Sequence, residues 1–147
     1  MKSKIIIGSD HAGFKLKTRL IKYLEKHDFN VEDKGIYEMK RSDYPDIASI
    51  VAKEVQNTDF VGILICGTGI GMSVTANKYS GIRAALIYNK KTAKLAAQHN
   101  NANIITLGGR QINYNKAKHM VNLYLNTKFE KGRHLKRTKK IKEIENE

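Results

Sequence analysis

Residues 61–73 read Val-Gly-Ile-Leu-Ile-Cys-Gly-Thr-Gly-Ile-Gly-Met-Ser. The run from Val61 to Ile65 is almost wholly apolar, which is typical of a central strand covered on both faces. Cys66 ends this run, and the alternating glycines after it lead into the start of a helix. A buried strand, a turn and a helix in this order form the repeating unit of parallel α/β sheets.

The same alternation continues on both sides of this segment. Further β-rich runs occupy residues 4–7, 29–32, 82–87 and 103–107. Apolar residues at helical spacing follow the first run, and helices are predicted from Pro45 to Val55 and at 92–98, 116–125 and 135–144. We therefore expect one α/β domain over residues 1–147. It is a three-layer αβα sandwich with a Rossmann-like, mainly parallel five-stranded sheet and an extra C-terminal helix.

The composition narrows the class of protein. The 147 residues include 27 Lys and Arg against 14 Asp and Glu, a formal net charge of +13. The lysines are spread along most of the chain, whereas nucleic-acid binding favours a concentrated basic stripe, so no nucleic-acid partner is expected. The apolar runs are too short for a membrane span or a signal peptide, and a single cysteine forms no intrachain disulfide. A cytoplasmic protein is expected.

Ligands of open α/β sheets bind outside the carboxyl ends of the strands, so the strand ends are the informative places. They carry residues 9–11, 66–73, 88–89 and 108–110. The glycine loop after Cys66 favours negative charge through its N–H groups. Its G-x-G-x-G spacing differs from the dinucleotide fingerprint, and Met72 stands where a phosphate loop of nucleoside triphosphatases needs lysine.

Each candidate residue also has a structural interpretation. Cys66 fits a nucleophile, a redox thiol, a proton acceptor or a small buried apolar side chain. Asp10 fits a helix cap, and His99 closes a helix, where the macrodipole stabilises a histidine. Arg133 and Arg137 are four residues apart, so on a helix they share a face that suits either a phosphate or solvent.

Seven ordered segments together resemble a known family. They are Ser-Asp-His-Ala-Gly-Phe at 9–14, Ser-Asp-Tyr-Pro-Asp at 42–46, Cys-Gly-Thr-Gly-Ile-Gly-Met-Ser at 66–73, Ala-Asn-Lys at 76–78, Gly-Ile-Arg-Ala at 81–84, Gln-His-Asn at 98–100 and Gly-Arg-His at 132–134. The chain resembles, over nearly its whole length, the type B ribose-5-phosphate isomerases, whose family includes galactose- and allose-6-phosphate isomerases. Lys131 departs from the glycine that many members have before Gly-Arg-His.

The resemblance implies an aldose–ketose isomerase that needs no metal or organic cofactor and works as a homodimer with shared active sites. Its implied catalytic residues are Cys66 as the base, His99 for ring opening and Thr68 for proton movement. The resemblance also implies that the backbone of Gly67, Thr68, Gly69, Ile70 and Gly71 would hold the enediolate. By the same resemblance, Asp10 would bind sugar hydroxyls with Asn100 nearby in the substrate site. The phosphate would be surrounded by His11, Arg110, Arg133 and Arg137, with His134 as a weaker candidate.

Two kinds of alternative remain open at this point. Within the family, the substrate is either ribose 5-phosphate or a six-carbon aldose 6-phosphate of the allose or galactose type. The presence of all implied residues in one chain favours the ribose enzyme. Outside the family, one alternative is a redox thiol protein, but this chain has no second cysteine to act as the resolving thiol. The other alternative is a nucleic-acid-binding module, whose binding would depend steeply on salt concentration.

Overall fold

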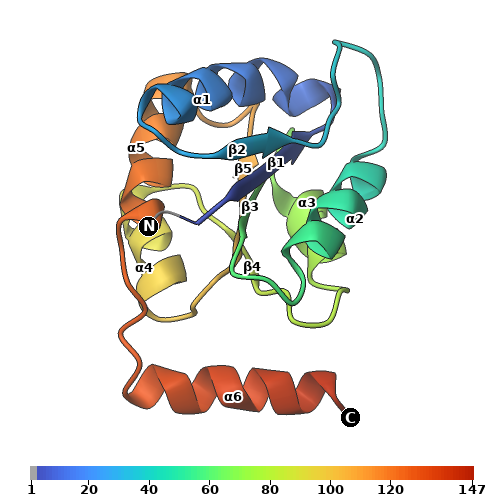
Figure 1. Ribbon diagram of the computed structural model, residues 1–147. Helices are drawn as coiled ribbons and strands as arrows, with labels where there is room; N and C mark the ends of the chain where they lie inside the picture. Colours follow the sequence, from blue (N-terminus) through green and yellow to red (C-terminus); the bar gives the residue numbers. More distant parts are fainter. Residues whose placement is uncertain (1–2) are drawn as a thin grey trace.

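The computed structural model describes residues 3–147, and its centre is a five-stranded sheet in which every strand pair is parallel (Figure 1). The strands are β1 (Ile5–Ser9), β2 (Val31–Asp33), β3 (Val61–Cys66), β4 (Ala84–Leu86) and β5 (Ile104–Gly108), in the spatial order β2-β1-β3-β5-β4. Ile5 pairs with Val61 and Gly62 with Ile104 at the amino edge, whereas Cys66 pairs with Gly108 at the carboxyl edge.

Helices cover both faces of the sheet, as the three-layer prediction requires. One layer holds α1 (Phe14–Lys26), α4 (Lys90–Gln98) and α5 (Tyr114–Leu125), which pack on Ile5, Ile63 and Ile105. The other layer holds α2 (Tyr44–Val55) and α3 (Ile70–Ala76), which pack on Ile6 and Leu64. Because neighbouring strand residues point to opposite faces, both faces of the central strands are buried and their sequence reads as continuously apolar.

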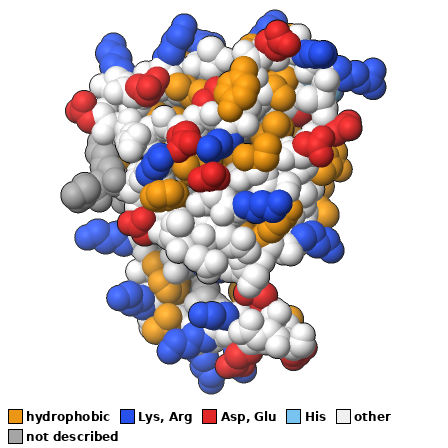
Figure 2. Space-filling view, turned by 45° about the vertical axis from the view of Figure 1, so that its right-hand side comes forward, with side chains coloured by type: hydrophobic (Ala, Val, Ile, Leu, Met, Phe, Trp, Pro, Cys, Tyr) orange, Lys and Arg blue, Asp and Glu red, His pale blue; other side chains and the backbone are white. Residues whose placement is uncertain are grey.

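The sixth helix, α6 (Arg133–Glu145), is the predicted extra element and lies below the sheet in Figure 1. A 3-10 turn, η1 (His11–Gly13), separates β1 from α1. Of the α6 residues only His134 is buried, while Leu135, Ile141 and Ile144 are exposed. Lys and Arg side chains gather on this lower lobe in Figure 2, beside several acidic side chains. No helix within residues 3–147 is long and apolar enough to cross a membrane.

The predicted elements are all present, with shifted ends. Helix α4 begins at Lys90 rather than Thr92 because Asn89 accepts the Thr92 N–H and the Thr92 hydroxyl accepts the Asn89 N–H, a capping box. Helix α5 begins at Tyr114 rather than Lys116, since Asn113 caps it by accepting the Lys116 N–H. Strand β2 lies two residues later than its predicted start at Phe29.

Candidate active site

The carboxyl edge of the sheet brings together three of the predicted site segments. The Asp10 N–H donates to Ile65 O at 3.2 Å, which places Asp10 directly beside the end of β3. On the other side of β3, the Gly109 N–H donates to Cys66 O at 2.7 Å, and the Arg110 N–H donates to Gly67 O at 3.1 Å. We call Asp10, His11, residues 66–71 and Arg110 the carboxyl-edge group.

Cys66 is 4% exposed and its sulfur faces the glycine loop. The Gly69 N–H donates to Cys66 Sγ at 3.2 Å. Gly69 adopts φ +81°, a left-handed conformation that is routine only for glycine, and this turn points its N–H back at the sulfur. A donated N–H stabilises negative charge on sulfur, so the loop geometry suits a thiolate.

Thr68 and Gly71 belong to the same loop. Thr68 is exposed, and its hydroxyl oxygen accepts the Ile70 N–H at 3.2 Å, which leaves the hydroxyl proton available for donation. Gly71 lies against the ring of Tyr44 from the start of α2, and any side chain at residue 71 would overlap that ring. The Tyr44 ring therefore forms a wall of the loop on the side of α2.

Asp10 and His11 are each held by backbone groups. Asp10 is 5% exposed, and its Oδ1 accepts the N–H groups of Ala12 and Gly13 at 3.0 and 3.2 Å. The cap interpretation of Asp10 is therefore confirmed, and Oδ2 is left for a ligand hydroxyl. His11 Nδ1 accepts the Ser42 N–H at 3.2 Å, so in the neutral ring the proton sits on Nε2, which can donate to an anion.

The remaining predicted residues lie at the amino edge of the sheet. His99 and Asn100 follow the end of α4, a few residues before β5 begins at Ile104. The His99 and His134 rings are stacked with centroids 4.0 Å apart, and the Glu130 N–H donates to Gln98 O at 3.0 Å. We call the set His99, Asn100, Arg133, His134 and Arg137 the amino-edge group.

These two groups lie at opposite edges of the sheet within one chain. Ile104, which follows His99 by five residues, and Gly108, which pairs with Cys66, are four residue steps apart on β5, or about 13 Å of strand. Helix α6 extends along the amino edge, where Thr138 and Ile141 line a hollow with Ile82 and Asn101. One chain therefore does not bring His99, Arg133 and Arg137 to the Cys66 loop.

His134 occupies an unusual electrostatic position. It is 3% exposed, and its Nε2 lies 3.6 Å from Glu130 Oε1, too far for a good hydrogen bond. Burial lowers the pKa of His134, and the nearby His99, Arg133 and Arg137 lower that pKa further, against the opposing effect of Glu130. The neutral ring is therefore favoured.

His99, Glu130 and His134 also offer three metal-ligand atoms within 4.8 Å of one another. The two imidazole planes are inclined by only 14°, so their in-plane lone pairs run side by side rather than converging on one point. Tetrahedral metal sites need convergent lone pairs. In this arrangement the pair is better suited to stacking than to chelation.

The structure also reveals residues to which the sequence interpretation gave no role. Ser42 donates its N–H to His11, Tyr44 lies against the glycine loop, and the buried Lys17 forms an ion pair with the half-buried Asp33 just before the loop at 34–43. Ser42 and Tyr44 belong to the segment 42–46 that carries the family resemblance, and this was the available signal. Lys17 precedes Leu20 by three residues and Leu24 by seven. This spacing places Lys17 on the apolar face of α1.

Comparisons with known families, sequences and structures all match nearly the whole chain. The model of the Ribose/Galactose Isomerase family matches residues 5–141. Ribose-5-phosphate isomerase B of Escherichia coli (strain K12) is 42% identical over 143 residues, which are 97% of this chain and 96% of the relative. A crystal structure of a ribose 5-phosphate isomerase from Thermotoga maritima has a TM-score of 0.92 and 47% identity, covering 97% of this chain and 99% of that one.

A third similar protein carries a ligand. The crystal structure of ribose-5-phosphate isomerase B from Mycoplasma genitalium with bound ribulose-5-phosphate has a TM-score of 0.96 and 43% identity, covering 100% of this chain and 99% of that one. The similarity is thus high in both sequence and backbone, and it extends over both edges of the sheet. The chain belongs to the ribose/galactose isomerase family.

Proposed function

We propose that this protein is an aldose–ketose isomerase that interconverts ribose 5-phosphate and ribulose 5-phosphate through an enediolate. The observation that carries the proposal is the position of Cys66 Sγ, which ends a buried strand and accepts the N–H of Gly69 within a loop of backbone donors. The ribulose 5-phosphate bound to a relative that is 43% identical supports the choice of substrate.

Cys66 acts as the base in this mechanism. As a thiolate it takes the proton from C2 of the open-chain aldose and delivers it to C1, which yields the ketose. General-base catalysis of this kind contributes about 10² to 10⁴ in rate. The negative charge of the enediolate develops beside residues 67–71, where fixed N–H donors are each worth about a hundredfold or more. Thr68 assists proton movement between the two oxygens.

The other residues bind and prepare the sugar phosphate. Asp10 offers its Oδ2 to sugar hydroxyls, and Asn100 assists it. His99 opens the furanose ring. His11 and Arg110 at one edge, with Arg133 and Arg137 from the other, surround the phosphate, which holds the reacting carbons in register with Cys66.

The active sites are shared in a homodimer. The amino-edge group of one chain completes the carboxyl-edge group of its partner, since a single chain keeps them at opposite edges of the sheet. Exposed apolar residues support this assembly: Ile70 and Val74 on α3 are 56% and 58% exposed beside the glycine loop, and Ile141 on α6 is 48% exposed. The chemistry uses no metal or organic cofactor, and we place the enzyme in the cytoplasm.

A two-substrate assay tests the proposal. Purified protein is incubated separately with ribose 5-phosphate and allose 6-phosphate, and ketose formation is followed. We expect a clear preference in kcat/KM for the pentose. A large preference for the hexose would change the substrate assignment, and no turnover of either sugar would reject the function.

A further inference from the structure

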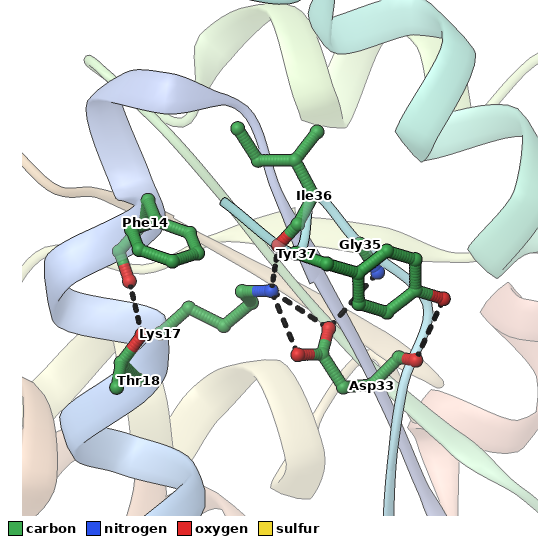
Figure 3. Close-up of polar contacts among 7 residues, drawn as sticks. All are labelled: Phe14, Lys17, Thr18, Asp33, Gly35, Ile36 and Tyr37. Atoms are coloured by element: carbon green, nitrogen blue, oxygen red, sulfur yellow. Dashed lines mark hydrogen bonds and ion pairs between the residues drawn. The ribbon is translucent and has the colours of Figure 1, made fainter. Parts of the chain in front are cut away.

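A buried lysine lies behind the loop that borders the carboxyl-edge group (Figure 3). Lys17 of α1 is 0% exposed, and its Nζ donates to Asp33 Oδ1 and Oδ2 at 2.7 and 2.9 Å and to Ile36 O at 2.5 Å. An ammonium group has three protons, and here each has an oxygen acceptor. The buried charge is thus fully paired, as burial of an ion requires.

The three acceptors belong to one segment of chain. Asp33 ends β2, and its Oδ1 also accepts the Gly35 N–H at 2.9 Å, while Ile36 O comes from the loop itself. Residues 35 and 36 continue the pairing beyond β2, since the Ser9 N–H donates to Gly35 O at 2.7 Å and the Ile36 N–H donates to Ser9 O at 2.9 Å. The start of the loop at 34–43 is therefore held by Lys17 on one side and by backbone hydrogen bonds to β1 on the other.

The far end of the same loop reaches the site. Ser42 donates its N–H to His11 Nδ1 at 3.2 Å, and this contact keeps the ring proton on Nε2. His11 follows Ser9 by two residues, so the loop contacts the site at both of its ends. The loop therefore links the Lys17 contact near its start to the His11 contact near its end.

We propose that Lys17 and Asp33 are positioning residues for anion binding: they fix the loop at 34–43 so that Ser42 holds His11 with Nε2–H directed to the phosphate. The inference rests on the proposed function for the identity of the anion. It assigns to Lys17 a role that acts through the loop and Ser42, with no contact to the substrate.

The experiment compares Lys17→Met with Lys22→Met, a matched control on the exposed face of α1. The first readout is the ring ¹⁵N spectrum of His11 in the ligand-free protein, which reports the tautomer without reference to catalysis. The second is the affinity for inorganic phosphate. We expect Lys17→Met to give a mixture of the two His11 tautomers. We also expect it to weaken phosphate binding about tenfold, because the charge-assisted hydrogen bond from His11 Nε2–H to the phosphate is lost. Lys22→Met should match the wild type in both.

Kinetics add a third readout. Lys17→Met should raise KM for ribose 5-phosphate by about the same tenfold factor while kcat changes much less, because the Cys66 loop is intact. Lys17→Arg, which keeps the charge, should recover part of the phosphate affinity. If the protein turns over no ribose 5-phosphate, the proposed function fails, yet the His11 spectrum still decides the role of Lys17.

A purely structural ion pair gives a different pattern. In that case Lys17→Met lowers thermal stability but leaves the His11 tautomer and the phosphate affinity at wild-type values, and this result overturns the proposal. If the Lys17→Met protein does not fold, the Asp33→Asn protein, which retains one oxygen acceptor, takes its place. The His11 tautomer and the phosphate affinity are then measured on Asp33→Asn. Wild-type values in a folded Asp33→Asn protein overturn the proposal equally.

Discussion

The imidazole rings of His99 and His134 lie face to face, with centroids 4.0 Å apart and planes inclined by 14°. They come from the end of α4 and the first turn of α6. Because His134 is the one buried residue of α6, this stack joins the helix that carries Arg133 and Arg137 to the body of the protein. Together with the bond from the Gly81 N–H to Glu145 Oε1, the stack places the helix that carries the arginines, and burial lowers the pKa of His134 within it.

Acidification should weaken the fold through His134. Its folded-state pKa is lowered by burial from 6.5, so the unfolded chain takes up a proton at this residue more readily than the folded one. The stability that it contributes is complete above 6.5 and is lost as the pH falls below 6.5. Urea midpoints at about pH 7.5 and 5.5 measure the loss, and His134→Phe, which keeps a stacked ring, should reduce it. His119 is exposed, so the control variant His119→Gln should lose as much stability between the two pH values as the wild type does. An identical loss of stability in the wild type and in His134→Phe would contradict the prediction.

Gly69 and Gly81 form a matched pair for testing the glycine loop. Both have left-handed φ angles, +81° and +82°, but a Cβ at residue 69 would lie 2.6 Å from Leu86 Cδ1, whereas nothing lies within 4 Å of one at residue 81. Gly81→Ala should cost only backbone strain, about 1–2 kcal/mol. Gly69→Ala should cost more and should also displace the N–H that reaches Cys66, with a loss of kcat. Thermal unfolding and kinetics measure both effects. Equal behaviour of the two variants would remove the special role of Gly69.

Complementation tests the shared active site. Cys66→Ala and His99→Asn proteins should each be nearly inactive, but a mixture that has exchanged subunits contains dimers with one intact site. For equal amounts and random exchange, about one quarter of all sites are intact, so activity should recover to about a quarter of the wild type. A site built within one chain predicts no recovery, because every chain carries a defect.

Replacement of Cys66 tests the proposed base. Cys66→Ala should lower kcat by about 10² to 10⁴ while the affinity for inorganic phosphate stays unchanged, because the phosphate-binding residues are elsewhere. Circular dichroism and the phosphate affinity serve as controls for folding. Turnover at the wild-type rate would exclude Cys66 as the base.

Much of the fold follows directly from periodicity in the sequence. The apolar run at 61–65 and the helical spacing of apolar residues predict the elements and the parallel sheet. The strand order did not follow, because both faces of the central strands are covered and Ile5, Ile6 and Ile7 look alike although they point to different layers. Periodicity also places the starts of α4 and α5 two residues late, because Asn89 and Asn113 cap these helices ahead of their first apolar residues.

The separation of the candidate site into two groups was implicit in the sequence. A helix that connects two parallel strands returns from the carboxyl edge to the amino edge, so a residue that closes such a helix, as His99 does, lies opposite a residue that ends a strand, as Cys66 does. The role of Lys17 is harder to predict. Its spacing to Leu20 places it on the apolar face, but its acceptors come from a loop without periodicity.

The placement of Arg133 and Arg137 at the edge opposite Cys66 also bears on how such genes diverge after duplication. When two chains assemble each site, one copy can lose its cysteine and keep its arginines while the other copy does the reverse. The mixed pair then retains one working site, although neither product works alone. Two duplicated genes can thus come to depend on each other for one activity. This dependence follows from the position of α6 at the edge of the sheet opposite Cys66.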